Sequence, residues 1–211
     1  LARRKGIKLL LIGRRERDGA IDDALMDLRR RGTEVAYRAL DISDEARLVD
    51  ALTVAEREWG AIDLVVHCGG AQDDRLLADI DPSMIARVLA AKVAGTEALR
   101  TAVSQVALRP RVIAFSSLAG WFGNPGQTIY AAANAYQDAV ALDESDWQSI
   151  AWPLWDGIGM APPEAEMARL ARETGLMPLP EAEGLTAFDQ VLASLESCVA
   201  VAFGESEAPA L

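Results

Sequence analysis

The sequence predicts an α/β fold in which parallel strands form an open, doubly wound sheet with helices on both faces. Two observations lead to this prediction. Short apolar runs alternate with helical patterns along most of the chain, as in repeated strand–helix–strand units. The apolar runs are continuous, which is typical of strands that are buried on both faces. A chain of 211 residues, 51% of them hydrophobic, can bury such a core.

Six apolar runs are predicted to be strands. The first is Lys8–Gly13, which reads KLLLIG and is followed by arginine. Each run is short and ends at small or polar residues, the usual boundary of a buried strand. The other predicted strands cover residues 34–40, 63–67, 111–116, 149–152 and 199–203.

The predicted helices repeat apolar residues at steps of three and four. The first covers residues 18–31, and Ser43 is expected to cap the second. Asp81 and Pro82 are expected to begin a long helix that runs to about residue 108, because aspartate favours the N-cap and proline the first turn. Further helices are predicted at residues 130–141, 163–173 and 181–195.

The composition excludes several classes of function. A net charge of −11 argues against nucleic-acid binding, because phosphate contacts need a basic surface. No apolar run approaches the roughly 20 residues of a membrane span, so no membrane association is expected. One histidine and the two cysteines Cys68 and Cys198 provide neither a metal cluster nor a disulfide framework. A reducing cytoplasm is therefore the expected location.

Small or polar residues follow five successive predicted strands. Taken singly, each has a structural explanation, such as a helix cap or a tight turn. Together they indicate one crevice, because ligands of open α/β sheets bind outside the carboxyl ends of the strands. These strand ends are Arg14 and the segments 41–44, 67–70, 116–117 and 153–157.

Lys92 lies on an apolar helix stripe. Residues 85, 89, 92, 96 and 99 follow steps of four, three, four and three, which place them on one face. Burial of an amine without partners is costly. The spacing alone leaves two interpretations open: a lysine whose amine extends to water, or an amine that is held in a functional site.

Tyr130 and Asn134 share one face at the start of a predicted helix, because they are four residues apart. Ser117 stands at the end of the preceding strand, and a Gly-Asn-Pro-Gly turn at 123–126 leads the chain back toward the sheet. A hydroxyl and a phenol can therefore converge on one substrate. The alternative is a half-buried tyrosine that only packs and a serine that only caps a helix.

With these residues in place, the sequence resembles the short-chain dehydrogenase/reductase superfamily, and within it the ketoreductase domains of polyketide synthases and related fatty acid synthases. The pattern Tyr-x-x-x-Asn with an upstream lysine, here Tyr130, Asn134 and Lys92, is typical of the synthase domains, whereas stand-alone reductases usually carry Tyr-x-x-x-Lys. The other matching motifs are LLLIGR (9–14), LDISD (40–44), VVHCGG (65–70), AAKVAGTEAL (90–99), FSSLAG (115–120), GQTIYAAANAYQDA (126–139) and IAWPLWDGIGMA (150–161).

The resemblance implies a reaction and four catalytic residues. The reaction is NADPH-dependent reduction of a β-ketoacyl thioester, borne by the phosphopantetheine of an acyl carrier protein, to the 3-hydroxyacyl thioester. Tyr130 would give a proton to the ketone oxygen while Ser117 binds the same oxygen. Lys92 would lie near the cofactor ribose and lower the pKa of the phenol. Asn134 would hold a proton-relay water or orient the lysine.

The resemblance also implies where NADPH binds. Arg14 corresponds to the residue that clamps the 2′-phosphate. Asp41 and Ile42 correspond to adenine contacts, Cys68 and Gly69 to the stretch that passes close to the cofactor, and Pro153 to a backbone contact near the nicotinamide. No metal is expected.

Stereochemistry and substrate access depend on two further segments. Ketoreductases of the B type carry Leu-Asp-Asp where this sequence has Gln72-Asp73-Asp74, so a D-configured product is expected with Asp74 as a determinant. The tryptophan of the A type falls at Phe122, and Met160 is a further candidate. Residues 157–181, which could also be an ordinary connection, correspond to the family's substrate lid.

The sequence departs from the family at one place. The glycine-rich turn that holds the pyrophosphate, together with the strand before it, is not found in the 211 residues. Either the motif lies in a stretch outside this sequence, or the domain is an inactive structural subdomain of a synthase. The first explanation is favoured, because all four catalytic residues are present. A single catalytic domain over residues 1–211 within a larger synthase is expected, with neighbouring synthase domains as partners. A stand-alone short-chain reductase is the other alternative.

Overall fold

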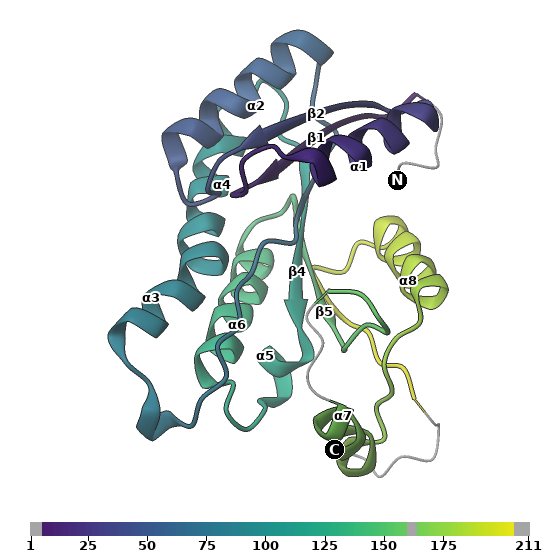
Figure 1. The fold of residues 1–211 in the computed structure, drawn as a ribbon. Coiled ribbons are helices and arrows are strands. Elements are labelled where there is room, and N and C mark those ends of the chain that lie inside the picture. Colours follow the sequence, from purple (N-terminus) through teal and green to yellow (C-terminus); the bar gives the residue numbers. More distant parts are fainter. Residues whose placement is uncertain (1–5, 160–163, 205–211) are drawn as a thin grey trace. The chain divides into compact units, whose positions relative to one another are not determined.

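The computed structural model describes residues 6–159 and 164–204. The chain divides into two compact units, which are described separately. The first unit comprises residues 1–65 and 93–110, and the second comprises residues 66–92 and 111–211. Alternating strands and helices, with three parallel strand pairs, confirm the predicted α/β fold (Figure 1).

The first unit is built around two parallel strands, β1 (Lys8–Gly13) and β2 (Glu34–Ala39), in which Leu10 pairs with Ala36. Its helices are α1 (Gly19–Arg30), α2 (Glu45–Trp59) and α4 (Gly95–Ser104), and α2 packs against α4. The buried faces of these helices carry apolar residues: Leu25, Leu48, Leu52, Ala55, Ala98 and Leu99.

The prediction that Ser43 caps the second helix is wrong. Asp44 is the N-cap of α2, and its carboxylate accepts a hydrogen bond from the amide of Arg47. Ser43 instead donates from its amide and its hydroxyl to the carboxylate of Asp41, at 3.0 and 2.8 Å. Both residue types favour N-caps, and here Asp41 competes for the serine hydroxyl.

The second unit contains the strands β4 (Arg111–Ser117), β5 (Trp147–Trp152) and β6 (Cys198–Ala200). They belong to a four-stranded sheet of order β3-β4-β5-β6, where β3 is Leu64–His67. Ser117 pairs with Trp152, so the carboxyl ends of β4 and β5 lie side by side. The helices of this unit are α3 (Pro82–Leu89), α5 (Leu118–Phe122), α6 (Thr128–Asp143), α7 (Glu164–Thr174) and α8 (Glu181–Ala193).

The described strands form two parallel sheets, β1-β2 and β3-β4-β5-β6, rather than one. No strand among the described residues pairs with both β1 and β3.

The expected long helix from residue 82 is interrupted. Asp81 is the N-cap and Pro82 the first residue, as predicted. After α3, however, residues Ala90–Ala94 form a π-helical turn, and α4 ends at Ser104. Such turns are rare and are frequently found at functional sites.

Among the described helices, none combines the length and the apolar character that a membrane crossing needs. Within the same residues, no three histidine, cysteine, aspartate or glutamate side chains come together as potential metal ligands.

Candidate active site

Lys92 is the most informative residue of the second unit. Its side chain is 2% exposed, and its Nζ donates hydrogen bonds to the carbonyl oxygen of Phe115 at 2.7 Å and to Oε1 of Gln137 at 2.9 Å. Burial lowers the pKa of the amine to about 8, while Asp138 and Cys68 act in the opposite direction. The interpretation that this lysine extends to water is therefore wrong.

Tyr130, Asn134 and Gln137 lie on one face of α6, because they are separated by four and three residues. The amide nitrogen of Asn134 donates to the Tyr130 carbonyl oxygen at 2.7 Å. Its Oδ1 is buried, and no described residue hydrogen-bonds to it. An acceptor that is buried without a partner is costly unless a water or ligand fills the role.

Burial raises the pKa of the Tyr130 phenol, and the charge of Asp74 adds to this effect. The neighbouring side chains of Ser117 and Asn134 act in the opposite direction. The expected lowering of this pKa by Lys92 is not found. The phenol consequently stays protonated over the whole neutral pH range.

Ser117 has two roles in the geometry. Its hydroxyl oxygen caps α5 by accepting a hydrogen bond from the amide of Ala119 at 3.2 Å. The same side chain lies close enough to Tyr130 to influence the phenol pKa. The capping interpretation is therefore compatible with a position beside the Tyr130 phenol.

The residues that follow β3 pass close to the side chain of Lys92. Cys68 is exposed, and Gly69 and Gly70 follow it. A Cβ on Gly70 would lie 3.1 Å from Cε of Lys92, so the absence of a side chain makes room for the lysine stem. Pro153 directly follows β5.

Asp74 is held by two glutamines. Nε2 of Gln72 donates to Asp74 Oδ2 at 2.6 Å, and Nε2 of Gln127 donates to the same oxygen at 2.9 Å. The amide of Arg75 also donates to the Gly126 carbonyl at 2.9 Å. These bonds attach the loop that carries Asp74 to the turn before Tyr130. The Asp74 carboxylate raises the pKa of the Tyr130 phenol.

Phe122 is 59% exposed at the end of α5. Its neighbour Trp121 donates from Nε1 to Asp138 Oδ2 at 3.1 Å. Met160, the third candidate for stereochemical control, lies outside the described residues.

The remaining cofactor candidates belong to the first unit. Arg14 directly follows β1 and is exposed, while Asp41 and Ile42 are half-buried beyond β2. Hydrogen bonds from the amide and hydroxyl of Ser43 lower the pKa of the Asp41 carboxyl, and the charge of Arg14 lowers it further. Arg14 and Asp41 are therefore within electrostatic reach of each other.

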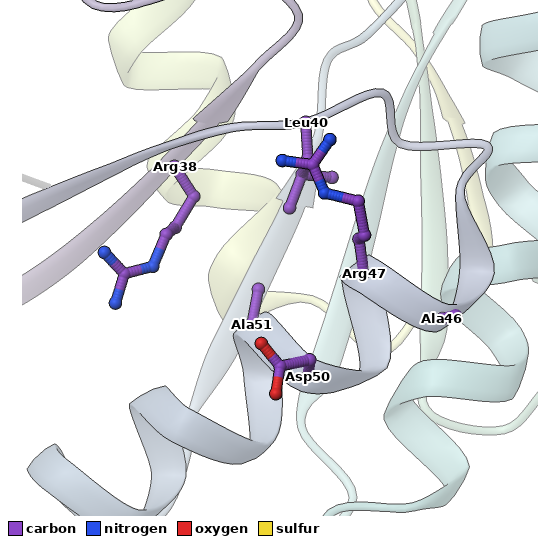
Figure 2. A pocket seen from close by; sticks show the side chains of 6 residues that line it. All are labelled: Arg38, Leu40, Ala46, Arg47, Asp50 and Ala51. Atoms are coloured by element: carbon purple, nitrogen blue, oxygen red, sulfur yellow. The ribbon is translucent and has the colours of Figure 1, made fainter.

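A pocket beside β2 and α2 in the first unit includes none of these three candidates. Figure 2 shows the guanidinium groups of Arg38 and Arg47 and the carboxylate of Asp50 around it. One Arg47 nitrogen is already bound to the Ala39 carbonyl oxygen at 2.6 Å. This pocket therefore does not support a cofactor site at these residues.

Sequence reasoning missed Gln137 and Asp138, and it included His67 only as part of the strand end at residues 67–70. Gln137 could have been found from its spacing, since it continues the face of Tyr130 and Asn134. After burial, the charge of Asp138 has the largest effect on the pKa of Lys92, and it raises that pKa. His67 is 1% exposed, and its Nε2 lies 3.1 Å from the Ala91 carbonyl oxygen, next to Lys92.

Comparisons with known proteins agree on one family. The family model described as KR domain matches residues 1–157. Polyketide synthase ThaG of Burkholderia thailandensis is 37% identical over 99% of this chain, and polyketide synthase GfsB of Streptomyces halstedii is 38% identical over 88% of it. The chain spans only 4% and 3% of the lengths of these two relatives.

Solved structures give the same result. A ketoreductase domain from the bacillaene assembly line superposes with a TM-score of 0.87 at 31% identity. The match covers 95% of this chain and 50% of the solved chain.

Proposed function

The chain belongs to the KR domain family of polyketide synthases, and from this premise we propose that it reduces a β-ketoacyl thioester to the 3-hydroxyacyl thioester with NADPH. The acyl chain would be carried by an acyl carrier protein through its phosphopantetheine arm. Family membership supports the ketoreductase class and a nicotinamide cofactor. The preference for NADPH, the carrier protein and the neighbouring synthase domains are parts of the proposal.

One observation carries the proposal: the buried amine of Lys92, with Tyr130, Ser117 and Asn134 in the same compact unit. Burial of a lysine that is only 2% exposed lowers the stability of the fold unless the amine has hydrogen-bond partners, and such buried ionisable groups are common at functional sites. Here its Nζ is fixed by two oxygen acceptors from β4 and α6. Fixed donors in a site of low dielectric are the arrangement that stabilises charge developing on a substrate.

Tyr130 is the proposed general acid. Its raised pKa keeps the proton on the phenol until the substrate oxygen becomes basic. The Ser117 hydroxyl would donate to the same oxygen and fix its position. The unpartnered Oδ1 of Asn134 would accept a hydrogen bond from a water that returns a proton to Tyr130.

Each unit, taken separately, contains residues that would suit part of a nicotinamide cofactor. In the second unit, Gly69 and Gly70 let the backbone pass close to His67 and Lys92, and Cys68 and Pro153 stand at the ends of β3 and β5. In the first unit, the exposed Arg14 offers a guanidinium to a 2′-phosphate, and Asp41 and Ile42 would contact adenine. The bound cofactor supplies the hydride, and the protein supplies position and acid catalysis.

Substrate selection is proposed for the flanking segments. Asp74, fixed by Gln72 and Gln127, would make this a B-type domain that forms a D-configured product. Phe122 and Met160 would contact the acyl chain, and residues 157–181 would act as a lid. All of residues 1–211 would serve as one catalytic domain.

The competing function is an inactive structural subdomain of a synthase, which the lack of a glycine-rich turn in the sequence favours. A direct test incubates the protein with NADPH and a β-ketoacyl N-acetylcysteamine thioester and identifies the product by mass spectrometry. We expect the 3-hydroxyacyl thioester. Absence of product together with absence of NADPH binding would support the structural role. Turnover of small ketones, but of no thioester, would instead indicate a stand-alone type of reductase.

A further inference from the structure

The one histidine of the sequence is buried at the end of β3, beside the turn that carries Lys92. His67 is 1% exposed, and its Nε2 lies 3.1 Å from the carbonyl oxygen of Ala91. A carbonyl oxygen only accepts hydrogen bonds, so the proton of the neutral ring must be on Nε2. Nδ1 is then an acceptor, and it is buried without a partner among the described residues.

Ala91 belongs to the π-helical turn Ala90–Ala94, of which Lys92 is the central residue. A π turn contains one more residue than an α turn and is intrinsically less favourable, so it needs support from outside the helix. His67 provides such support, because its N–H reaches the backbone carbonyl directly before the lysine. The backbone after His67 also passes close by, since a Cβ on Gly70 would lie 3.1 Å from Lys92 Cε.

We propose that His67 is a positioning residue for Lys92, which holds the π-helical turn through the bond from Nε2–H to the Ala91 carbonyl. The proposal rests on the proposed function, in that it concerns the lysine assigned to the reaction. Without this bond the turn is expected to relax toward α-helix. Loss of one residue from the turn would rotate Lys92 by about 100° around the helix axis. Its Nζ would then leave the acceptors on Phe115 and Gln137.

Two substitutions separate positioning from simple packing. His67→Gln keeps an N–H donor on a side chain of similar reach, whereas His67→Leu keeps apolar volume and removes the donor. Val191→Ala is the control for stability alone, because Val191 is 3% exposed in α8 and takes no part in the proposed site.

The principal readout does not require catalysis. The sequence contains three lysines, Lys5, Lys8 and Lys92, so ¹³C-lysine labelling gives three Cε signals, and Lys92→Met identifies the signal of interest. In the unchanged protein this signal should titrate near the lowered pKa of about 8. His67→Leu should move its midpoint away from this value, because the amine leaves its two oxygen acceptors, while His67→Gln and Val191→Ala should leave it in place.

Steady-state reduction provides the second readout. His67→Leu should lower kcat by roughly 10- to 100-fold, with the KM of the thioester changed little, while His67→Gln stays within a few-fold of the parent. The proposal is overturned if the Lys92 signal is the same in His67→Leu and in the control. It is equally overturned if His67→Gln and His67→Leu behave alike. A parent that shows the lowered lysine pKa but no reduction would contradict the proposed function and leave the positioning role intact.

Discussion

The Nζ of Lys92 donates a 2.9 Å hydrogen bond to Oε1 of Gln137, which joins the π-helical turn after α3 to the middle of α6. Both side chains are buried, at 2% and 0% exposure. Tyr130 and Asn134 lie on the same face of α6 as Gln137. The bond therefore connects the amine to the helix that carries the proposed proton donor.

Replacement of this acceptor should change the titration of the lysine. Gln137→Leu removes one acceptor from a buried ammonium, so the pKa of Lys92 should fall below about 8. The free energy of unfolding should decrease by about 1.5–3 kcal/mol, typical for a lost hydrogen bond to a charged group. Gln137→Glu should raise the same pKa, because it adds a negative partner. Lysine NMR and urea unfolding measure the two effects, and an unchanged pKa in both variants would contradict the assigned bond.

The close approach of α5 to α6 should not tolerate a methyl group. A Cβ on Gly120 would lie 3.0 Å from the backbone nitrogen of Ala135 and 3.1 Å from Cβ of Asn134. Gly120→Ala should therefore destabilise the protein by about 1–3 kcal/mol and displace Asn134. Gly19→Ala is the matched control, because nothing lies within 4 Å of a Cβ built there. Equal unfolding midpoints for the two variants would be evidence against this packing.

His67 should contribute a pH-dependent part of the stability. Burial, followed by the charge of Lys92, lowers its pKa from 6.5 to about 4. The unfolded chain therefore binds a proton between these pH values that the folded chain does not, and stability falls as the pH falls from 6.5 to about 4. The contribution is about 3 kcal/mol, from about 1.4 kcal/mol per pH unit.

The measurement compares urea unfolding of the parent and of His67→Gln across this pH range. Carboxylates with lowered pKa values, such as Asp41, titrate in both proteins, so they cancel in the difference. A difference in unfolding free energy that stays constant with pH would rule out a neutral buried histidine.

Asp74 should influence the configuration of the product. Asp74→Asn keeps the size of the side chain, removes the charge that raises the Tyr130 pKa, and alters the bonds from Gln72 and Gln127. We expect a larger share of the L-configured 3-hydroxyacyl product, detected by chiral chromatography. Asp79→Asn, on the exposed short helix Leu77–Asp79, is the control. An identical product ratio in all three proteins would remove Asp74 from stereochemical control.

Much of the fold could be predicted because its signals are local. Continuous apolar runs marked the strands, and the Asp81-Pro82 pair marked the start of α3. The π-helical turn could not be predicted, since residues 90–94 read AAKVA and are compatible with an ordinary α-helix. The sequence also could not show that Asp44, and not Ser43, is the N-cap of α2. Ser43 is engaged by the Asp41 carboxylate through hydrogen bonds that form only in the folded turn.

The candidate site shows the same division. Lys92 was recognisable because a charged side chain on an apolar helix face is costly to bury unless it has partners. Its partners were not, because the Phe115 carbonyl belongs to the backbone and Gln137 reads as an ordinary polar helix residue. The lowering of the Tyr130 pKa by Lys92 was expected from the resemblance, whereas burial dominates in the structure.

The measurement that tests the account most directly is NADPH oxidation with a β-ketoacyl thioester, in the parent and in two tyrosine variants. Tyr130→Phe removes the proposed proton donor, and Tyr136→Phe is the matched control from the same helix. The account predicts that Tyr130→Phe loses at least about 100-fold in kcat, in line with general acid catalysis, while Tyr136→Phe retains most of its activity. Equal activity of the two variants would contradict the central claim that Tyr130 protonates the substrate.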